Sequence, residues 1–495
     1  MTDLTGKHLI AGDWVPGEAT FRTDPATGGP AEIHAGSADL VDRAAQAAEE
    51  AFHAYAASAR EVRAVFLTAI AEELEARADE IVPMAMAESA LPEGRIRDIE
   101  LPRTANQMRL FAGHIRDDAH LDLRRDAGGP DLRIVQRPIG PVAVFGASNF
   151  PLAFSTAGGD TAAALAAGCP VVVKAHEAHA GTCELVARGI QAAADRSGMP
   201  AGVFNQVQGG SLDVGQALVV HPLIKAVGFT GSYRGGKALF DLAASRSEPI
   251  PVFAEMGSVN PMFLLPRALA GKGADLGNGW AASLTMGVGQ FCTNPGIAVL
   301  LNGPDADAFR DACAAALKAT GAQTMLTAGI AQAYRDGIAT LSAQQGVTAH
   351  VTSDPKGRDA QPVLFETDAA TFLANDTLSH EIFGPAGLIV RAASIDEMER
   401  IARALEGQLT VTLHMTQEDA DHVRQLLPIL ERKAGRILAN GFPTGVKVSD
   451  AMVHGGPWPA SSNFGATSVG TLAIRRFLRP VCYQDIPEMF LAETA

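Results

Sequence analysis

The sequence predicts an α/β protein whose domains are built on parallel sheets. Between residues 141 and 257, short apolar runs alternate with helical stretches four times over. Continuous apolar strands joined by helical crossovers are typical of a parallel sheet covered on both faces. Further strands and helices between residues 256 and 440 indicate a second α/β domain. A chain of 495 residues is long enough for two or three domains.

The composition narrows the class of protein. Hydrophobic residues make up 47% of the chain and charged residues 19%, which predicts a large buried core. The net charge of -15 weighs against a general nucleic-acid or anionic-membrane binder. The five cysteines are odd in number and show no zinc spacing, so we expect reduced thiols and no metal. With neither a signal peptide nor an apolar stretch of about 18–20 residues, we expect a cytoplasmic protein.

The first elements carry no predicted chemistry. The first 35 residues are rich in Gly and Pro with short apolar runs, which predicts a hairpin or arm. Ser37 is a candidate N-cap for the helix that follows it. A second helix is predicted from Arg60 to Glu88, with apolar residues on one side at Val62, Phe66, Ile70, Leu74 and Ile81. Packing explains both helices.

The first sheet is predicted from strands at 141–146, 170–174, 203–210, 224–232 and 251–257, and helices at 155–167, 178–197 and 233–245. Parallel sheets bind ligands beyond the carboxyl ends of their strands. Candidate site residues follow these strands, namely Asn149, Lys174, Gly209, Ser232 and Glu255.

Four of the candidates suggest specific chemistry, each beside a simpler structural explanation. The glycines at 229–236 expose backbone N–H groups that favour a phosphate, although the spacing is not GxGxxG and, taken alone, the segment fits a tight strand-to-helix turn better. Cys292 lies among glycines that let backbone approach whatever its sulfur attacks, or it is a small buried residue. Glu255 in a cleft could act as a base. Asn149 could stabilise an oxyanion, or simply form a turn.

Six segments together resemble the aldehyde dehydrogenase superfamily, in the family's order and over nearly the whole chain. They are GASNFPL (146–152), VVVKAHE (171–177), GFTGS (228–232), AEMGSVNP (254–261), GQFCTNPG (289–296) and HEIFGP (380–385). Segments 440–462 and 468–484 are most similar to the α-ketoglutaric semialdehyde (2,5-dioxopentanoate) dehydrogenase branch. A related NADP-dependent fatty-aldehyde branch shares part of this pattern.

The resemblance implies a mechanism at matching positions. Cys292 would add to the aldehyde carbon as a thiohemiacetal, with Asn149 and the Cys292 N–H holding the oxyanion. Loss of hydride to the cofactor would leave a thioester, which water activated by Glu255 would hydrolyse. The implied substrate is 2,5-dioxopentanoate, giving 2-oxoglutarate, with a broad-specificity or fatty-aldehyde dehydrogenase as the alternative.

The resemblance also implies a Rossmann-type cofactor domain, a catalytic domain and small β arms for a homodimer or homotetramer. We expect the cofactor domain at 1–117 and 139–254, the catalytic domain at 255–440, the arms at 118–138 and 471–495, and an active-site closing loop at 441–470. The implied cofactor residues are Lys174, His176, Glu177, Gly209, Gly231, Ser232, Gly257, Glu381 and Phe383.

Two positions bear on the details of this mechanism. Gly158 stands where many family members have a lysine thought to relay protons, so the proton exit path is open to question. Phe154 lines the substrate channel or packs in the core, at even odds.

The choice between NAD and NADP depends on the segment that follows the second strand. Glu177 would bind ribose hydroxyls and repel a 2′-phosphate, which favours NAD. Lys174 and His176 could pair with that phosphate, which favours NADP. Because the semialdehyde branch often uses NADP, we expect NADP, with NAD as the alternative.

Other classes of function remain for comparison. A non-catalytic binding protein is disfavoured because Cys292, Glu255 and Asn149 occur together. A thiol hydrolase or acyltransferase would need a histidine partner for Cys292, and none of the 13 histidines stands in a recognisable Cys/His signature. We expect the other cysteines, Cys169, Cys183, Cys313 and Cys482, to be small buried residues.

Overall fold

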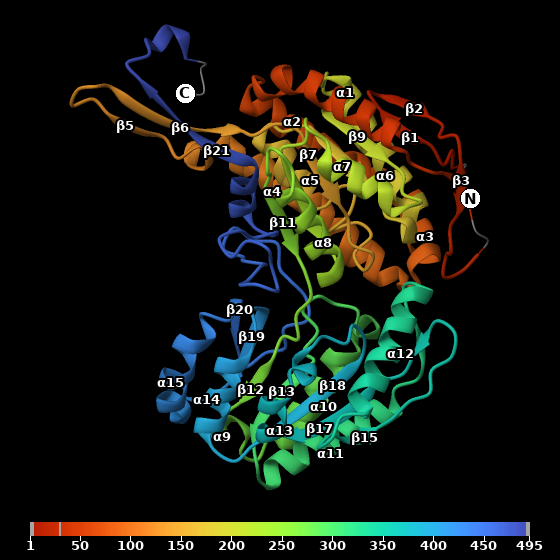
Figure 1. The fold of residues 1–495 in the computed structure, drawn as a ribbon, viewed down its shortest axis with the longest axis vertical. Helices are drawn as coiled ribbons and strands as arrows, with labels where there is room; N and C mark the ends of the chain where they lie inside the picture. Colours follow the sequence, from red (N-terminus) through yellow and green to blue (C-terminus); the bar gives the residue numbers. More distant parts are fainter. Residues whose placement is uncertain (1–3, 29–30, 492–495) are drawn as a thin grey trace. The chain divides into compact units, whose positions relative to one another are not determined.

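The computed structural model describes residues 4–28 and 31–491. The chain divides into two compact units (Figure 1). Unit 1 comprises residues 1–254, 448–452 and 466–495, and unit 2 comprises residues 255–447 and 453–465. The last four residues of the predicted C-terminal arm, 492–495, lie outside the described part.

A seven-stranded sheet forms the centre of unit 1, in the order β11-β10-β7-β8-β9-β1-β2. Strands β10, β7, β8 and β9 are parallel, as their apolar sequences predict, and β1 joins β9 and β2 antiparallel. The strands are β7 (Val142–Phe145), β8 (Val171–Lys174), β9 (Phe204–Val207), β10 (Ala226–Thr230), β11 (Val252–Glu255), β1 (His8–Ile10) and β2 (Asp13–Val15). A separate pair in this unit is β3 (Thr20–Arg22) and β4 (Glu32–His34).

The α-helices α1 to α8 accompany the sheet of unit 1 (Figure 1). They are α1 (Ala38–Ala56), α2 (Arg60–Ala76), α3 (Ala78–Ser89), α4 (Leu101–Arg116), α5 (Gly159–Ala167), α6 (Ala180–Arg196), α7 (Leu212–Val220) and α8 (Tyr233–Ala244). Ser37 caps α1 by accepting a hydrogen bond from the Leu40 N–H.

The prediction of a single helix over residues 60–88 is wrong. The chain leaves helical geometry at Arg77 (φ -99°, ψ 15°), which separates α2 from α3. The helical spacing of apolar residues continues across this break, because Leu74 and Ile81 are both buried. Apolar spacing alone therefore does not reveal the break. Val62, predicted on the apolar side, is exposed. The helix predicted from residue 155 begins at Gly159 instead, after a series of turns.

Three strands of unit 1 form a small separate sheet that extends away from its helices (Figure 1). Strand β6 (Leu132–Pro138) lies between β5 (Arg124–Asp126) and β21 (Leu478–Gln484), antiparallel to both. The register pairs Leu478 with Pro138 and Gln484 with Leu132. The predicted sheet arms at 118–138 and after 471 therefore meet in one sheet.

Unit 2 contains a second seven-stranded sheet, in the order β15-β17-β18-β13-β12-β19-β20. All neighbours are parallel except β15 and β17. The strands are β12 (Met262–Leu264), β13 (Ile297–Leu301), β15 (Thr348–Val351), β17 (Val363–Asp368), β18 (Ala386–Ala392), β19 (Gln408–His414) and β20 (Ala434–Ala439), with a small pair β14 (Gln323–Thr324) and β16 (Asp359–Ala360).

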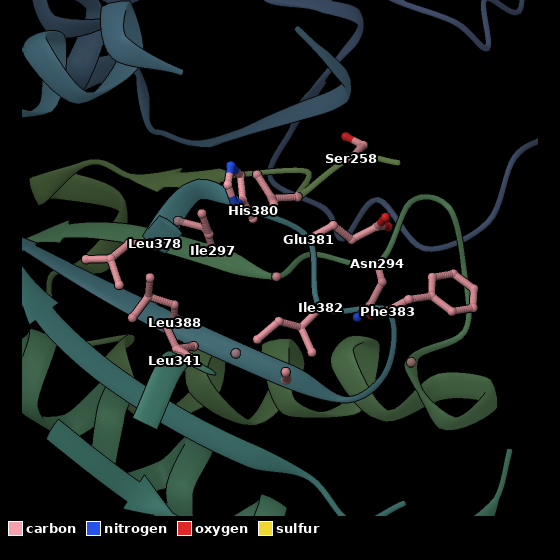
Figure 2. Close-up of a pocket in the computed structure, with 15 residues that line it drawn as sticks. Ser258, Asn294, Ile297, Leu341, Leu378, His380, Glu381, Ile382, Phe383 and Leu388 are labelled. Carbon is pink, nitrogen blue, oxygen red and sulfur yellow. The ribbon is translucent and has the colours of Figure 1, made fainter. Parts of the chain in front are cut away.

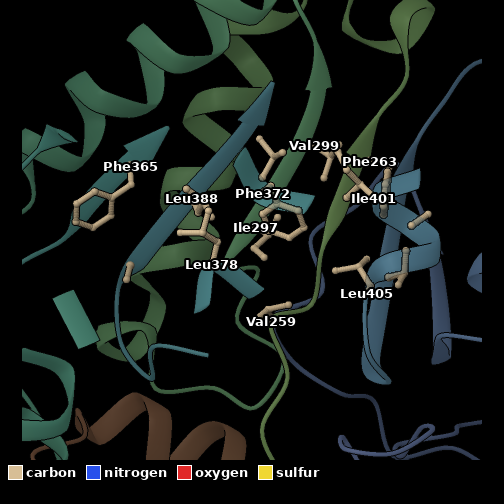
Figure 3. Packing of buried hydrophobic residues seen from close by; sticks show 14 of the residues in the cluster. Val259, Phe263, Ile297, Val299, Phe365, Phe372, Leu378, Leu388, Ile401 and Leu405 are labelled. Carbon is tan, nitrogen blue, oxygen red and sulfur yellow. The ribbon is translucent and has the colours of Figure 1, made fainter. Parts of the chain in front are cut away.

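The helices of unit 2 cover an apolar core on this sheet. They are α9 (Pro266–Leu269), α10 (Gly273–Thr285), α11 (Pro304–Ala319), α12 (Ala328–Ser342), α13 (Ala369–Ala374), α14 (Ile395–Ala404) and α15 (Ala420–Leu430). In Figure 3, Ile297 and Val299 of β13 and Leu388 of β18 lie with Phe372, Leu378, Ile401 and Leu405 in one buried cluster. This packing fixes the start of β13, just after Cys292. Within the described residues, no helix is both long and apolar enough to cross a membrane.

Candidate active site

Cys292 lies on a turn just before β13. The turn closes with a hydrogen bond from the Asn294 N–H to the Phe291 carbonyl (3.0 Å). Before it, Gly287, Val288 and Gly289 have φ of 56°, 60° and 66°, a left-handed stretch in which glycine is favoured. Cys292 is partly exposed, whereas Cys169, Cys183 and Cys313 are buried. The sequence therefore selects the one cysteine on a glycine-rich turn.

Asn260 holds this turn in place, a role that the sequence analysis missed. Its side-chain N–H₂ donates to the carbonyl oxygens of Cys292 and Asn294, both at 2.9 Å. Its Oδ1 accepts from the Thr410 hydroxyl (2.9 Å). Asn260 is fully buried at φ 46°, a conformation that asparagine tolerates better than most residues. Its position in the quoted segment 254–261 was the available signal.

Glu255 ends β11 and is buried, with 4% of its surface accessible. The Oε2 atom of Glu255 lies 3.1 Å from Nε2 of His454. The same nitrogen lies 3.4 Å from Sγ of Cys292. The sulfur, the nitrogen and a carboxylate oxygen all lie within 4.8 Å of one another. The structure thus brings together two predicted residues and one histidine that was not predicted.

His454 could not be found from spacing, because 162 residues separate it from Cys292. The sequence shows no recognisable Cys/His signature for Cys292, yet the structure places His454 beside it. His454 lies in the segment 440–462, whose similarity to the semialdehyde branch was the one signal in the sequence that pointed there.

A pocket in unit 2 contains Glu381 and Phe383 (Figure 2). Ile382, between them, points to the apolar lining near Leu388. Glu381 is solvent-accessible, yet it lies deep enough that desolvation raises its pKa to about 7. The negative charge of Glu255 raises this pKa further, and a hydrogen bond from the Ser258 N–H opposes the shift.

Gly257 allows Glu381 to lie where it does, because a Cβ at residue 257 would collide with the Glu381 carboxylate. In unit 1, a Cβ at Gly209 would likewise collide with the carboxylate of Glu177. Each carboxylate therefore lies directly against bare backbone. A carboxylate held in this way can accept hydrogen bonds from ribose hydroxyls. The residues at these two places therefore fit the dinucleotide that the sequence implies.

Lys174 and Glu177 form an ion pair at the end of β8, with 2.5 Å between Nζ and Oε1. Burial alone would raise the pKa of Glu177, but the charge and hydrogen bond of Lys174 outweigh it and lower that pKa. His176 is different: burial and the neighbouring His179 hold its pKa well below its usual value. Its Nδ1 accepts from the Ala178 N–H (3.1 Å). His176 is therefore neutral at pH 7.

Ser232 and Gly231 lie where β10 gives way to α8. The Ser232 hydroxyl caps α8 by accepting from the Gly235 N–H (3.2 Å), and Ser232 is exposed. A Cβ at Gly231 would lie 2.7 Å from the ring of Phe229. The helix N-terminus that was predicted as a phosphate site is thus formed, with Ser232 as its N-cap.

Asn149 lies in the loop after β7 and is buried with 8% of its surface accessible. Buried groups fix this loop: Glu100 accepts from the Leu152 N–H (3.3 Å), and Gln107 donates to the Ala153 carbonyl (3.0 Å). Phe154 is buried, with its ring edge-on to Phe150 at 5.2 Å between ring centres. The loop geometry is therefore set from within unit 1.

Gly158 has no room for a side chain. A Cβ there would lie 2.7 Å from the Ser155 amide nitrogen and 2.8 Å from the Ala153 carbonyl. The backbone of this loop therefore leaves no room for the lysine that the resemblance implies at this position.

One cysteine prediction is corrected. Cys482 is exposed on β21, not buried. Residues alternate between the two faces of a strand, so the apolar run around Cys482 does not bury each of its members.

Comparison with known proteins identifies the family. The chain matches the sequence profile of the aldehyde dehydrogenase family over residues 14–479. The chain belongs to the aldehyde dehydrogenase family. Alpha-ketoglutaric semialdehyde dehydrogenase 2 of Azospirillum brasilense is 52% identical, covering 99% of this chain and 96% of that protein. Alpha-ketoglutaric semialdehyde dehydrogenase of Acinetobacter baylyi is 44% identical, covering 100% and 96%.

The predicted fold class is confirmed by solved aldehyde dehydrogenases. One is aldehyde dehydrogenase C of Pseudomonas syringae, solved with NAD+ and octanal, with a TM-score of 0.84 at 22% identity over 98% of each chain. The predicted enzyme class is also confirmed: the chain is an NAD(P)-dependent aldehyde dehydrogenase.

Proposed function

We propose that this aldehyde dehydrogenase oxidises 2,5-dioxopentanoate (α-ketoglutaric semialdehyde) to 2-oxoglutarate, with Cys292 as the nucleophile. The chemistry rests on one observation: the sulfur of partly exposed Cys292 lies 3.4 Å from Nε2 of buried His454, which in turn lies 3.1 Å from Oε2 of buried Glu255. The substrate is taken from the two semialdehyde dehydrogenases that resemble the chain over nearly its full length.

Cys292 would form the carbon–sulfur bond to the aldehyde, and the C=O electron pair would move to oxygen as an alkoxide. Asn149 and the Cys292 N–H are the proposed donors to that oxygen, a type of contact typically worth about 3–4 kcal/mol. Once the thioester has formed, Glu255 would accept a proton from the attacking water. The burial of Glu255 keeps bulk water from competing for that proton.

The dinucleotide supplies the hydride acceptor when it is bound. We assign its adenosine ribose to Lys174 and Glu177 beside Gly209, and its pyrophosphate to Ser232 with Gly231. The nicotinamide ribose is assigned to Glu381 beside Gly257, with Phe383 near the ring. The two glycine-backed carboxylates support these assignments.

The remote carboxylate of the proposed substrate needs a cation, and Arg436 on β20 is the candidate. Burial lowers the pKa of Arg436, and the nearby Cys292 opposes that shift electrostatically, so the two groups lie close enough to interact. The guanidinium also donates to the carbonyl oxygens of Pro443 (2.8 Å) and Gly445 (3.1 Å). These bonds hold the guanidinium against the predicted closing loop, in which both acceptors lie.

A substrate panel tests this function. We expect kcat/KM for 2,5-dioxopentanoate to exceed that for pentanal and for decanal, and Arg436→Met to remove most of that difference while leaving pentanal oxidation nearly unchanged. Cys292→Ala should abolish oxidation while the protein still binds the dinucleotide. A preference for the long aliphatic aldehyde would reject the proposed substrate, and activity in Cys292→Ala would reject the mechanism.

The NADP preference expected from the sequence is a separate proposal. Two observations count against a preference for NADP. Lys174 is already paired with Glu177, and His176 is neutral, so neither is free to pair with a 2′-phosphate as the sequence suggested. Glu177 is therefore the residue that sets the preference. We expect Glu177→Gln to raise kcat/KM with NADP relative to NAD at least tenfold, because it removes a negative charge near the 2′-phosphate and frees Lys174. An unchanged ratio would show that Glu177 does not select the cofactor.

A further inference from the structure

We propose that His454 takes the proton of the Cys292 thiol and shares it with Glu255, so that a Cys–His–Glu relay activates the nucleophile. This inference rests on the proposed function, in which Cys292 attacks the aldehyde. It adds a third residue to the site.

The geometry places one nitrogen between an acid and a base. Nε2 of His454 lies 3.4 Å from the Cys292 sulfur and 3.1 Å from Oε2 of Glu255. Hydrogen bonds to sulfur are longer than those to oxygen, so both distances permit direct proton transfer. Because the same nitrogen serves both partners, a proton accepted from sulfur is already positioned for the carboxylate.

Because His454 and Glu255 are buried beside Cys292, the relay is the direct route by which the thiol proton can leave the sulfur. The His454 side chain is fully buried and that of Glu255 is 4% exposed, whereas Cys292 is partly accessible. An imidazolium formed in such surroundings is stabilised by an adjacent carboxylate rather than by water. Gly158 provides no alternative, since it carries no side chain and has no space for one.

The step balances as follows. The S–H bond of Cys292 breaks and its proton forms an N–H bond at Nε2 of His454, while the sulfur lone pair forms the bond to the aldehyde carbon. No electrons leave the residues at this stage, so no oxidant is needed. The positive imidazolium then lies between the carboxylate of Glu255 and the region in which the alkoxide develops.

The titratable and charged groups around His454, including its two partners in the relay, come from four parts of unit 2. Glu255 comes from the end of β11, Cys292 from the turn before β13, and Arg436 from β20. Glu381, after the short helical turn at 376–379, interacts with Glu255. Any pH profile of the thiol therefore reflects these groups together.

The test measures thiol reactivity apart from turnover. We would follow alkylation of Cys292 by iodoacetamide from pH 5 to 10 in the full-length protein, with Cys292→Ala as the background. We expect the wild-type rate to rise through an inflection at least one pH unit below the ordinary thiol value of about 8.5. In His454→Gln the inflection should move toward that value, and the rate at pH 7 should fall about tenfold.

Kinetics of the first turnover separate the two bases. His454→Gln should slow the burst of reduced cofactor, because thiohemiacetal formation becomes limiting. Glu255→Gln should slow the burst less than His454→Gln does, because the imidazole remains, and should slow the later steady state strongly, because the base for the attacking water is lost. Added imidazole should restore part of the burst in His454→Ala, and the matched control His422→Gln on α15 should behave as the wild type.

Each outcome decides the inference. A wild-type profile with only the ordinary thiol inflection would overturn the relay without any variant. If His454→Gln does not fold, His454→Asn and the wild-type profile still decide it. An unchanged profile and burst in His454→Gln, with Cys292→Ala inactive, would reject the relay and leave the proposed function intact. Activity in Cys292→Ala would reject both.

Discussion

Cys292 differs from Cys169 and Cys313 in its surroundings rather than in its sequence neighbours alone. Burial raises the pKa of Cys169 to about 11 and that of Cys313 to about 12, so both thiols stay protonated at neutral pH. Cys292 instead has an imidazole nitrogen in reach and access from outside. Chemical labelling near pH 7 should therefore distinguish Cys292 from these two thiols.

A pH-dependent cofactor affinity is expected from Glu381. Its pKa is raised to about 7, so the carboxylate that would accept ribose hydroxyls is ionised above that pH and protonated below it. The dissociation constant should therefore rise about tenfold as the pH falls from 8 to 6. Titration of the dinucleotide against protein fluorescence at each pH measures this constant.

Glu381→Gln should bind more weakly at pH 8 and lose the pH dependence. The matched control is Glu418→Gln, an exposed glutamate paired loosely with Arg267, which should retain the wild-type profile. A Glu381→Gln variant that keeps the wild-type pH dependence would assign that dependence to another group.

At the level of residues, sequence reasoning reached those that follow a strand or lie in a glycine-rich segment. Cys292 and Glu255 belong to this class, and the structure places them together. His454 lies beyond that kind of inference, because only folding brings it to Cys292. Asn260 was within the quoted motifs, but its bonds to the Cys292 turn depend on a backbone conformation that a motif does not reveal.

Elements were predicted well where apolar residues were continuous and less well at their ends. The parallel order of β10, β7, β8 and β9 follows from buried strands joined by helices. The break at Arg77 and the late start of α5 were missed, because both depend on backbone geometry while apolar spacing continues. The turns before α5 matter to the proposed function, because they carry Asn149, the proposed oxyanion donor, and Phe154.

The loop before α5 should tolerate no side chain at Gly158. Gly158→Ala should lower the free energy of unfolding by about 1–3 kcal/mol, because the new Cβ meets backbone atoms that cannot move independently. Gly113→Ala on α4 is the matched control: its Cβ meets nothing, and alanine should stabilise the helix by about 0.5–1 kcal/mol. Urea unfolding measures both. A Gly158→Ala protein as stable as the wild type would contradict the steric argument.

For the molecule as a whole, we propose a homo-oligomer assembled through the sheet of β5, β6 and β21. Large apolar side chains beyond β21 are exposed, with Met489 at 83% and Phe490 at 73%. Large exposed apolar side chains of this kind are typical of a contact surface.

Replacing these two side chains tests the assembly. The double variant Met489→Lys/Phe490→Lys should shift the mass measured by light scattering toward that of one chain, because charges would enter an apolar contact. Leu212→Lys on α7, also highly exposed but outside the arm, should leave the mass unchanged. An unchanged mass in the double variant would exclude this tail from the contact.

The origin of His454 has a consequence for biosynthesis. Unit 2 is built largely from residues 255–447, yet the short segment 453–465, which carries His454, joins it only after the chain has passed through residues of unit 1. A ribosome makes Cys292 long before it makes the imidazole that would activate it. On the relay we propose, the growing polypeptide would carry an unactivated thiol for most of its synthesis, protected from premature reaction until translation is almost finished.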